Sequence, residues 1–234
     1  MNKRFLTSIL ALIFIRAPDL SAQTDPQLRE IKVAAIDIVD TAHTLWLRIG
    51  TGKDAVEVPL NTRVFSPVLK YKGGGVALFY KSKADATAEQ PPKPFARVVL
   101  ENRKSLIVFT PASKGGGYRA YAIQNSSFPF GSFRMVNFSK LPVLVDLDRR
   151  QSILKTNQSK TFTFRNGKQS VPVKIQVKTE DGKTRVIRQT TWSVAATQRE
   201  LVFFFPNPRN KLVRARHFVD SKDTDVTSDA AASE

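Results

Sequence analysis

The sequence predicts an all-β protein of two tandem antiparallel β-sandwich modules, related by internal duplication and preceded by a cleaved signal peptide. This prediction depends on segments that alternate with period two, on turn signals between them and on a repeat. Residues 73–126 can be laid on residues 168–221 at a constant offset of 95. In this register Val76 falls on Val171, and apolar alternation, strand-ending prolines and loop lengths agree. We therefore expect the same strand order in both copies.

The predicted strands place apolar side chains at every second position. Residues 143–147 and 171–177 are the clearest examples, and this period puts alternate side chains on opposite faces of a sheet. Asn166-Gly167 and Asp181-Gly182 mark tight turns, because these pairs supply the positive φ angles of hairpins. Seven or eight short strands per module favour a sandwich of immunoglobulin-like type over an up-and-down barrel. The expected boundaries are 1–22 for the signal peptide, 30–126 for the first module, 127–132 for a linker, 133–221 for the second module and 222–234 for an acidic tail.

The first residues indicate export. Lys3 and Arg4 precede the apolar run 5–15, and small residues follow up to Ala22, which is the layout of a secretory signal peptide cut after Ala22. The run is about half of the ~20 apolar residues that span a bilayer, so a retained anchor is the less favoured alternative. No later segment predicts a transmembrane span, and the chain has no cysteine for a disulfide or a lipid anchor. We expect a periplasmic or secreted protein of the bacterial envelope.

The charge indicates the kind of partner. The formal net charge is +17, although acidic residues gather after Phe218, so the folded part is more basic than the whole chain. A positive field of this size favours polyanions, and in the envelope these are lipid headgroups, lipopolysaccharide, acidic glycans and extracellular DNA. The alternative is that the charge only keeps the protein soluble. The tail 222–234 is rich in Ser, Thr, Ala and Asp, which predicts disorder, and no specific nucleic-acid recognition is expected.

Catalytic chemistry is not apparent. The chain has two histidines, His43 and His217, whereas a zinc or copper site needs three or four nitrogen or sulfur ligands. No Gly-x-Ser-x-Gly motif marks a serine nucleophile, and Asp146 and Asp148 fit a solvated strand better than a pair of catalytic carboxylates. We therefore expect no enzyme activity, no cofactor and no metal.

A basic segment near the end of the second module is the first candidate binding site. Arg214 and Arg216 alternate on the last predicted strand, so they point to one face about 7 Å apart, a spacing that suits successive phosphates or sulfates. Two further basic residues, Arg209 and Lys211, lie in the turn before this strand.

An aromatic strand is the second candidate. Residues 201–205 are apolar on both faces, so one face fills the core of the module and the other, with Phe203 and Phe205, needs a second cover. That cover is the sister module, a protein partner or flanking loops. In the linker, Phe128 or Phe130 is expected to pack between the modules.

Two sandwich modules in an exported basic chain broadly resemble the periplasmic pilus chaperones. Arg29 and the strand 106–109 loosely stand in for the anchoring arginine and the long strand before the hinge in that family. The resemblance is one of architecture, so no site residues follow from it. It implies the second of two hypotheses, a chaperone-like protein that pairs edge strands with exported subunits. The leading hypothesis is a structural or adaptor protein that engages an anionic envelope component or an exported protein partner.

Overall fold

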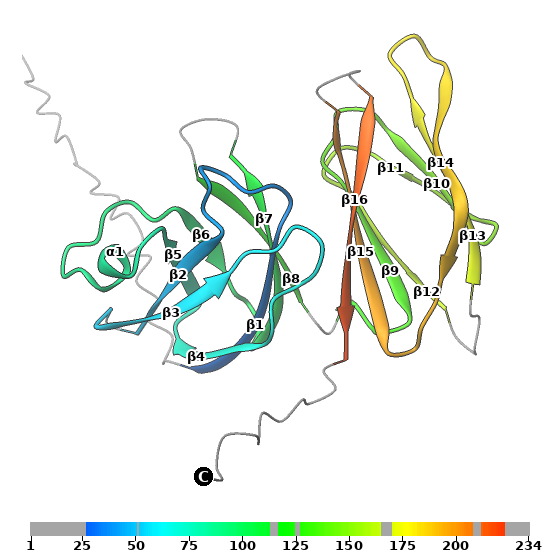
Figure 1. Ribbon diagram of the computed structural model, residues 1–234. Coiled ribbons are helices and arrows are strands. Elements are labelled where there is room, and N and C mark those ends of the chain that lie inside the picture. The colour runs from blue at the N-terminus through cyan, green and yellow to red at the C-terminus, as the bar shows by residue number, and fades with distance from the viewer. Residues whose placement is uncertain are drawn as a thin grey trace, which may run out of the picture.

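The computed structural model describes residues 27–50, 52–112, 117–124, 127–164, 170–207 and 212–222. The predicted signal peptide and the acidic tail beyond Lys222 lie outside these residues. The described chain forms two groups of eight strands, which we call module 1 (β1–β8) and module 2 (β9–β16) (Figure 1). The elements of module 1 are β1 (Gln27–Ala35), β2 (Thr44–Ile49), β3 (Asp54–Pro59), β4 (Leu69–Gly73), β5 (Val76–Tyr80), α1 (Lys83–Thr87), β6 (Ala96–Val99), β7 (Lys104–Pro111) and β8 (Tyr118–Gln124). Those of module 2 are β9 (Ser132–Asn137), β10 (Val143–Leu147), β11 (Arg150–Leu154), β12 (Ser159–Thr163), β13 (Ser170–Lys178), β14 (Thr184–Ser193), β15 (Gln198–Pro206) and β16 (Val213–Ser221).

Each module is a β-sandwich, so the all-β prediction is confirmed. Module 1 has sheets of order β4-β1-β7-β8 and β3-β2-β5-β6, and module 2 has sheets of order β12-β9-β15-β16 and β11-β10-β13-β14. The two sheets of each module share one core. In module 2 the alternation of residues 171–177 is the cause, because Val171, Val173, Ile175 and Val177 all point inward and are buried. None of the helices in the described residues is long and apolar enough to cross a membrane.

The order of strands differs from the immunoglobulin order. Immunoglobulin sandwiches place their first two strands in one sheet, whereas here β1 and β2 lie in different sheets. The first strand of each module also pairs in parallel with the seventh, as β1 does with β7 and β9 with β15. Strand length and spacing predicted a sandwich but carry no information on which strands become neighbours.

The two modules share one strand order, since each strand of module 1 matches the strand eight places later. The predicted offset of 95 holds where β7 pairs with β8 and β15 with β16. Pro111 pairs with Tyr118, and Pro206 with Val213, so both partners move by the same 95 positions.

The offset fails by one residue at β5 and β13. Val76 is 40% exposed, whereas Val171 is fully buried, so these two valines point to opposite faces. The core position of β5 is Ala77, which pairs with Val98 as Val171 pairs with Trp192. A slip of one residue exchanges the faces of a strand, so matching apolar residues by type alone did not fix the register.

Candidate binding surfaces at the module junction and on a basic hairpin

The modules meet through the outer faces of two sheets, and we call this contact the junction. Sheet β4-β1-β7-β8 of module 1 faces sheet β12-β9-β15-β16 of module 2 (Figure 1). One buried cluster joins them, and its members are Ala34, Ile36, Phe65, Leu106, Val108, Ile123, Phe128, Val136, Leu201, Phe203, Phe205 and Phe218. The linker residue Phe128 is fully buried in this cluster, as the sequence predicted.

Equivalent positions of the two modules build the junction. Leu106, Val108 and Ile123 of module 1 match Leu201, Phe203 and Phe218 of module 2 under the shared register of the last hairpins. The parallel strand pairs extend the match, because Ala34 pairs with Val108 as Val136 pairs with Phe203. The same surface on both partners is the arrangement of an isologous dimer, here within one chain.

The second cover of the aromatic strand is the sister module. On β15, Val202 and Phe204 point into the core of module 2, whereas Leu201, Phe203 and Phe205 point into the junction. Phe203 is fully buried, with its ring 5.5 Å from Phe138 and 5.8 Å from Tyr121 of module 1. Phe203 therefore holds the modules together and is not exposed to a ligand.

The two described basic candidates form ion pairs across the junction. Arg214 Nη2 lies 2.9 Å from Asp37 Oδ2, and Arg216 Nη2 lies 3.5 Å from Asp37 Oδ1. Both arginines thus point to one face, as predicted, but they share a carboxylate of module 1. The side chains of Arg214, Arg216 and Asp37 are each about two-fifths exposed. The other two candidates, Arg209 and Lys211, lie outside the described residues.

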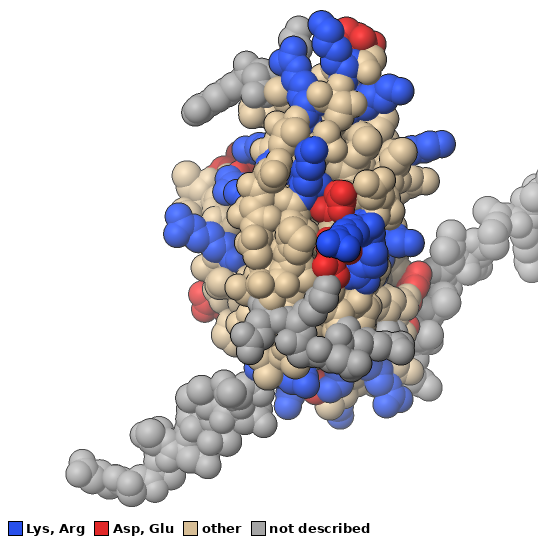
Figure 2. Space-filling model, turned by 90° about the vertical axis from the view of Figure 1, so that its right-hand side faces the viewer, with Lys and Arg blue, Asp and Glu red and all other residues tan. Residues whose placement is uncertain are grey.

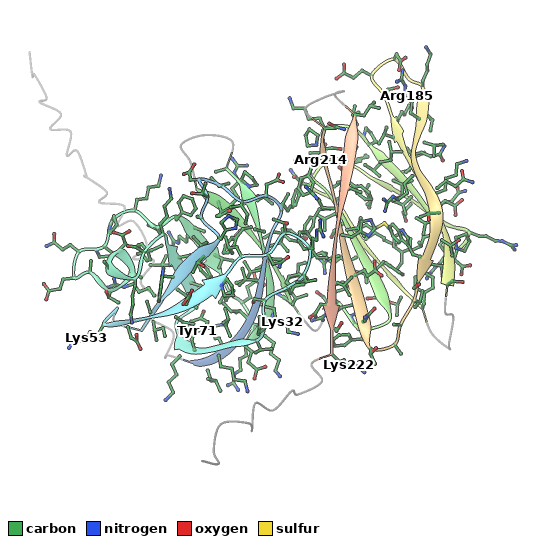
Figure 3. The ribbon with its side chains drawn as sticks, in the orientation of Figure 1. Lys32, Lys53, Tyr71, Arg185, Arg214 and Lys222 are labelled. Carbon is green, nitrogen blue, oxygen red and sulfur yellow. The ribbon has the colours of Figure 1, made fainter. Side chains whose placement is uncertain are left out.

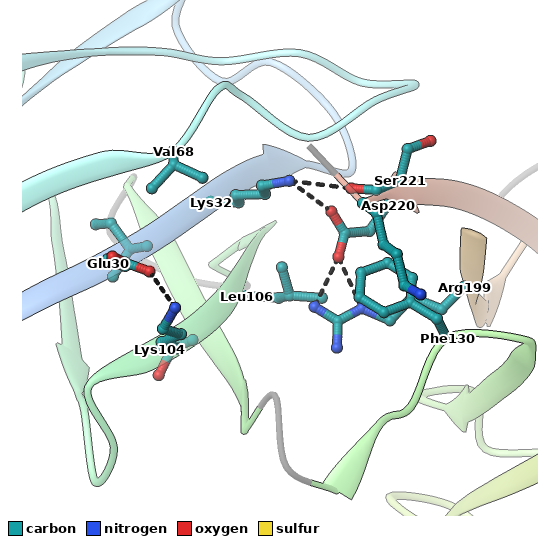
Figure 4. A pocket seen from close by; sticks show the side chains of 12 residues that line it. Glu30, Lys32, Val68, Lys104, Leu106, Phe130, Arg199, Asp220 and Ser221 are labelled. Carbon is teal, nitrogen blue, oxygen red and sulfur yellow. Dashed lines mark hydrogen bonds and ion pairs between the residues drawn. The ribbon is translucent and has the colours of Figure 1, made fainter. Parts of the chain in front are cut away.

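A buried charged cluster ties the linker to both modules at the other end of the junction. Asp220 of β16 accepts from Lys32 Nζ of β1 at 3.0 Å and from Arg199 Nε at 2.7 Å (Figure 4). Asp220 and Arg199 are 2% and 4% exposed. The guanidinium of Arg199 also donates to the carbonyl oxygen of Phe128 and lies over the rings of Phe128 and Phe130. We call Lys32, Asp220 and Arg199 the buried triad, although Lys32 itself is 13% exposed.

Two cavities lie at opposite ends of the junction. Arg214, near the start of β16, lines one of them, and Lys222, just after the end of β16, lines the other (Figure 3). The polar cavity, of about 390 Å³, contains the buried triad and the ion pair between Lys104 and Glu30. Two acidic residues, Glu30 and Asp220, offset only part of the positive charge of its four basic residues. The apolar cavity, of about 660 Å³, is lined mainly by Ile36, Ala120, Tyr121, Phe138, Phe205 and Pro206, with Arg119 and Arg214 among its polar residues.

Sequence reasoning missed a basic hairpin. Strands β13 and β14 project beyond the body of module 2, and Arg185 lies near their tip (Figures 1 and 3). Lys and Arg side chains gather at this upper end of module 2 (Figure 2). The exposed basic residues of the hairpin are Lys174, Lys178, Lys183, Arg185 and Arg188. The sequence did contain an indication of this basic surface, because the outward positions of residues 172–178 include two lysines.

The tip of this hairpin keeps some negative charge. Thr179 Oγ1 donates to the carboxylate of Asp181, and this hydrogen bond lowers the pKa of Asp181. Lys183 Nζ lies 3.4 Å from the same side chain. Asp181 and Glu180 are outnumbered by the five basic side chains, so the hairpin has a net positive charge.

The two histidines lie in different surroundings. His43 is exposed in the segment before β2. The ring of His217 packs edge-on against Trp192 with 4.6 Å between centroids, and its Nδ1 lies 3.6 Å from Glu200 Oε2. No group of three His, Cys, Asp or Glu side chains able to hold a metal occurs among the described residues.

Replacing His43 or His217 with alanine is expected to leave binding of any ligand unchanged. The His217 variant should lose only about 1 kcal/mol of stability, because it removes one aromatic contact and a long contact with Glu200. Titration calorimetry and urea unfolding measure the two effects, and elemental analysis should find no stoichiometric transition metal. Loss of binding in either folded variant would contradict a purely structural role for these residues.

No known protein family matches the chain, and no curated protein is significantly similar to it. The functional proposal therefore depends on the geometry of the junction and of the hairpin.

Proposed function

We propose that this chain is an exported binding protein without catalytic chemistry, which engages an anionic component of the bacterial envelope. The observation that carries the proposal is the basic hairpin of β13 and β14. It carries five exposed cationic side chains, of which Lys174 and Lys178 share the outer face of β13. Arg185 and Arg188 pair with core-facing residues of β13, so they lie on the other face of the hairpin. Alternate residues of a strand lie about 7 Å apart, so Lys174, Gln176 and Lys178 form a regular polar row that fits a repeating anionic ligand.

The basic segment expected from the sequence has a different role in this proposal. Arg214 and Arg216 share Asp37 of module 1, so their charge is partly compensated inside the molecule. Reversing both charges would place three carboxylates together and weaken the junction. Such a variant would therefore report on stability as well as on binding, and the hairpin offers a cleaner test.

Removal of three hairpin charges tests the proposal. In the variant Lys174→Gln/Lys178→Gln/Arg185→Gln we expect the slope of log K against log salt for heparin and lipopolysaccharide to fall by about two, because Lys174 and Lys178 share one face whereas Arg185 lies on the other. Each lost phosphate or sulfate contact lowers the slope by about one, because it releases fewer counterions. Salt-gradient elution and fluorescence titration at several salt concentrations measure the slope.

The matched control removes the same charge from module 1. Lys53, Lys70 and Lys72 are exposed, and their triple substitution by glutamine should leave most of the slope intact. Equal losses in both variants would show a response to net charge alone. Wild-type protein that fails to bind either polyanion at low salt would refute the proposal.

A second candidate function is strand pairing with an exported subunit, and β14 favours it. With ten residues β14 is the longest strand described, and it lies at the open edge of sheet β11-β10-β13-β14. An open edge can accept a strand from a partner through backbone hydrogen bonds. Hydrogen exchange separates the two functions, since a paired peptide would protect amides along β14, whereas a polyanion would contact side chains and leave these amides unchanged.

We further propose that the two modules arose by duplication and that residues 1–22 are a signal peptide. The shared order of eight strands and the shared register of the last hairpins support the duplication. The basic start, the short apolar run and the small residues up to Ala22 support export.

A further inference from the structure

The apolar cavity of the junction has the composition of a small-molecule site. Ligand sites commonly measure about 300–1,000 Å³, occur between domains and combine an apolar lining with a few polar groups. This cavity measures about 660 Å³ and opens between the ends of β7 and β15. Its apolar lining comes from both modules, as Tyr121 and Ile36 of module 1 face Phe138 and Phe205 of module 2.

The polar groups of the cavity are mainly cationic. Arg119 and Arg214, which occupy equivalent positions on β8 and β16, both line it. Asp37 is the one acidic residue of the lining, and Arg214 and Arg216 both contact it. Three arginines and one carboxylate leave a positive excess at this end of the junction. The side chain of Arg214 is 37% exposed although it pairs with Asp37, so part of its guanidinium is accessible to a ligand.

An asymmetry between the modules explains why there is room. Thr110 of β7 and Phe205 of β15 occupy equivalent positions, and both line the cavity. Module 2 places a phenylalanine ring where module 1 has the smaller threonine. The side chain of Thr110 is half-buried, and its hydroxyl donates to the carbonyl oxygen of Arg119 at 3.3 Å. The space that a second phenylalanine would occupy is part of the cavity.

We propose that the apolar cavity binds an amphipathic anion, with an aliphatic or aromatic body and a single carboxylate or phosphate head. The body contacts Ile36, Tyr121, Phe138 and Phe205, and the head accepts hydrogen bonds from Arg119 and Arg214. This site is separate from the basic hairpin and does not depend on polyanion binding there. Charge-assisted hydrogen bonds to a carboxylate or phosphate are the strong ones, so the head group fixes the orientation of the ligand.

Titration with ten-carbon probes tests the inference. Wild-type protein is expected to bind decanoate and decyl phosphate, and to bind decan-1-ol and decyltrimethylammonium about tenfold more weakly, because these lack the anionic head. Thr110→Phe should weaken decanoate binding by about tenfold, because the added ring occupies part of the cavity beside Phe205. Thr110→Val is the matched control, since it removes the hydroxyl without filling the space, and it should bind within about twofold of wild type. Arg119→Gln should weaken decanoate binding by about tenfold.

The outcomes separate the alternatives. No binding of decanoate by wild type, equal binding of decanoate and decan-1-ol, or wild-type affinity in a folded Thr110→Phe variant would each overturn the inference. Vesicles that contain phosphatidylglycerol distinguish the source of the head group, because a bilayer lipid should bind only if it can leave the membrane, and its binding should then be weakened by Thr110→Phe. Heparin binding should persist in Thr110→Phe, so failure at the cavity is distinguishable from failure at the hairpin.

Discussion

Replacing Asp220 with alanine is expected to lower the free energy of unfolding by about 3–5 kcal/mol. The substitution removes the carboxylate that the buried guanidinium of Arg199 shares with the partly buried ammonium of Lys32. The desolvation cost of these charges then remains, while their strongest favourable interaction is lost. Because Lys32 belongs to module 1 and Asp220 to module 2, the variant also weakens the junction. Urea unfolding at neutral pH measures the loss.

The ion pair between Lys104 and Glu30 provides the matched control. It lies in the same polar cavity with 2.8 Å between Nζ and Oε2, but its side chains are 62% and 27% exposed. Lys104→Ala is expected to cost less than about 1 kcal/mol, because solvent screens exposed pairs. Similar losses in the Asp220 and Lys104 variants would show that burial does not strengthen the triad.

Replacing Phe203 with alanine is expected to cost about 3–5 kcal/mol, because a large buried ring leaves a cavity. The loss should occur at the junction, where Phe203 contacts Phe138, Tyr121 and Phe218. We therefore expect the modules to unfold in two separate transitions, and the radius of gyration to increase before either module has unfolded. Urea unfolding followed by fluorescence and small-angle X-ray scattering measures these effects.

Phe204 is the matched control for this prediction. It is adjacent on β15 and equally buried, but its ring points into the core of module 2. Phe204→Ala should destabilise module 2 by a similar amount while the modules stay in contact until it unfolds. The role of Phe203 at the junction would be wrong if Phe203→Ala kept one transition and an unchanged radius of gyration, or if Phe204→Ala separated the modules.

The sequence contains enough information for the strands but not for their neighbours. Period two at residues 171–177 predicted a buried face, and all four predicted core residues of β13 are buried. Residues 76–80 are apolar at every position, so their alignment on residues 171–177 was not fixed to the residue, which is why Val76 and Val171 were paired although they face opposite sides. Sheet order depends on contacts between distant strands, so local patterns did not determine it.

The candidate sites were predicted less completely for a related reason. The two apolar faces of residues 201–205 indicated a second cover, but only the folded chain shows that the cover is module 1. Asp37 and Arg214 are 177 residues apart, so nothing in their local sequence indicates their ion pair. Asp220 lies near the acidic end of the sequence, yet it is buried and paired. The strand pattern predicted the strands of the basic hairpin, but it did not predict that the hairpin projects from the body of module 2.

The linker that joins the modules frees the junction from a constraint that acts on symmetric assemblies. In a homodimer every side chain of the contact surface appears twice, so a larger residue has to be accommodated at both equivalent positions. Here Val108 stays small where Phe203 is large, and Ile36 and Thr110 stay small where Phe138 and Phe205 are large. Module 2 supplies the larger side chains at these positions, and module 1 supplies the smaller ones that leave space for them. Tethering also keeps the two surfaces at a high effective concentration, so this unequal contact persists at any dilution of the protein.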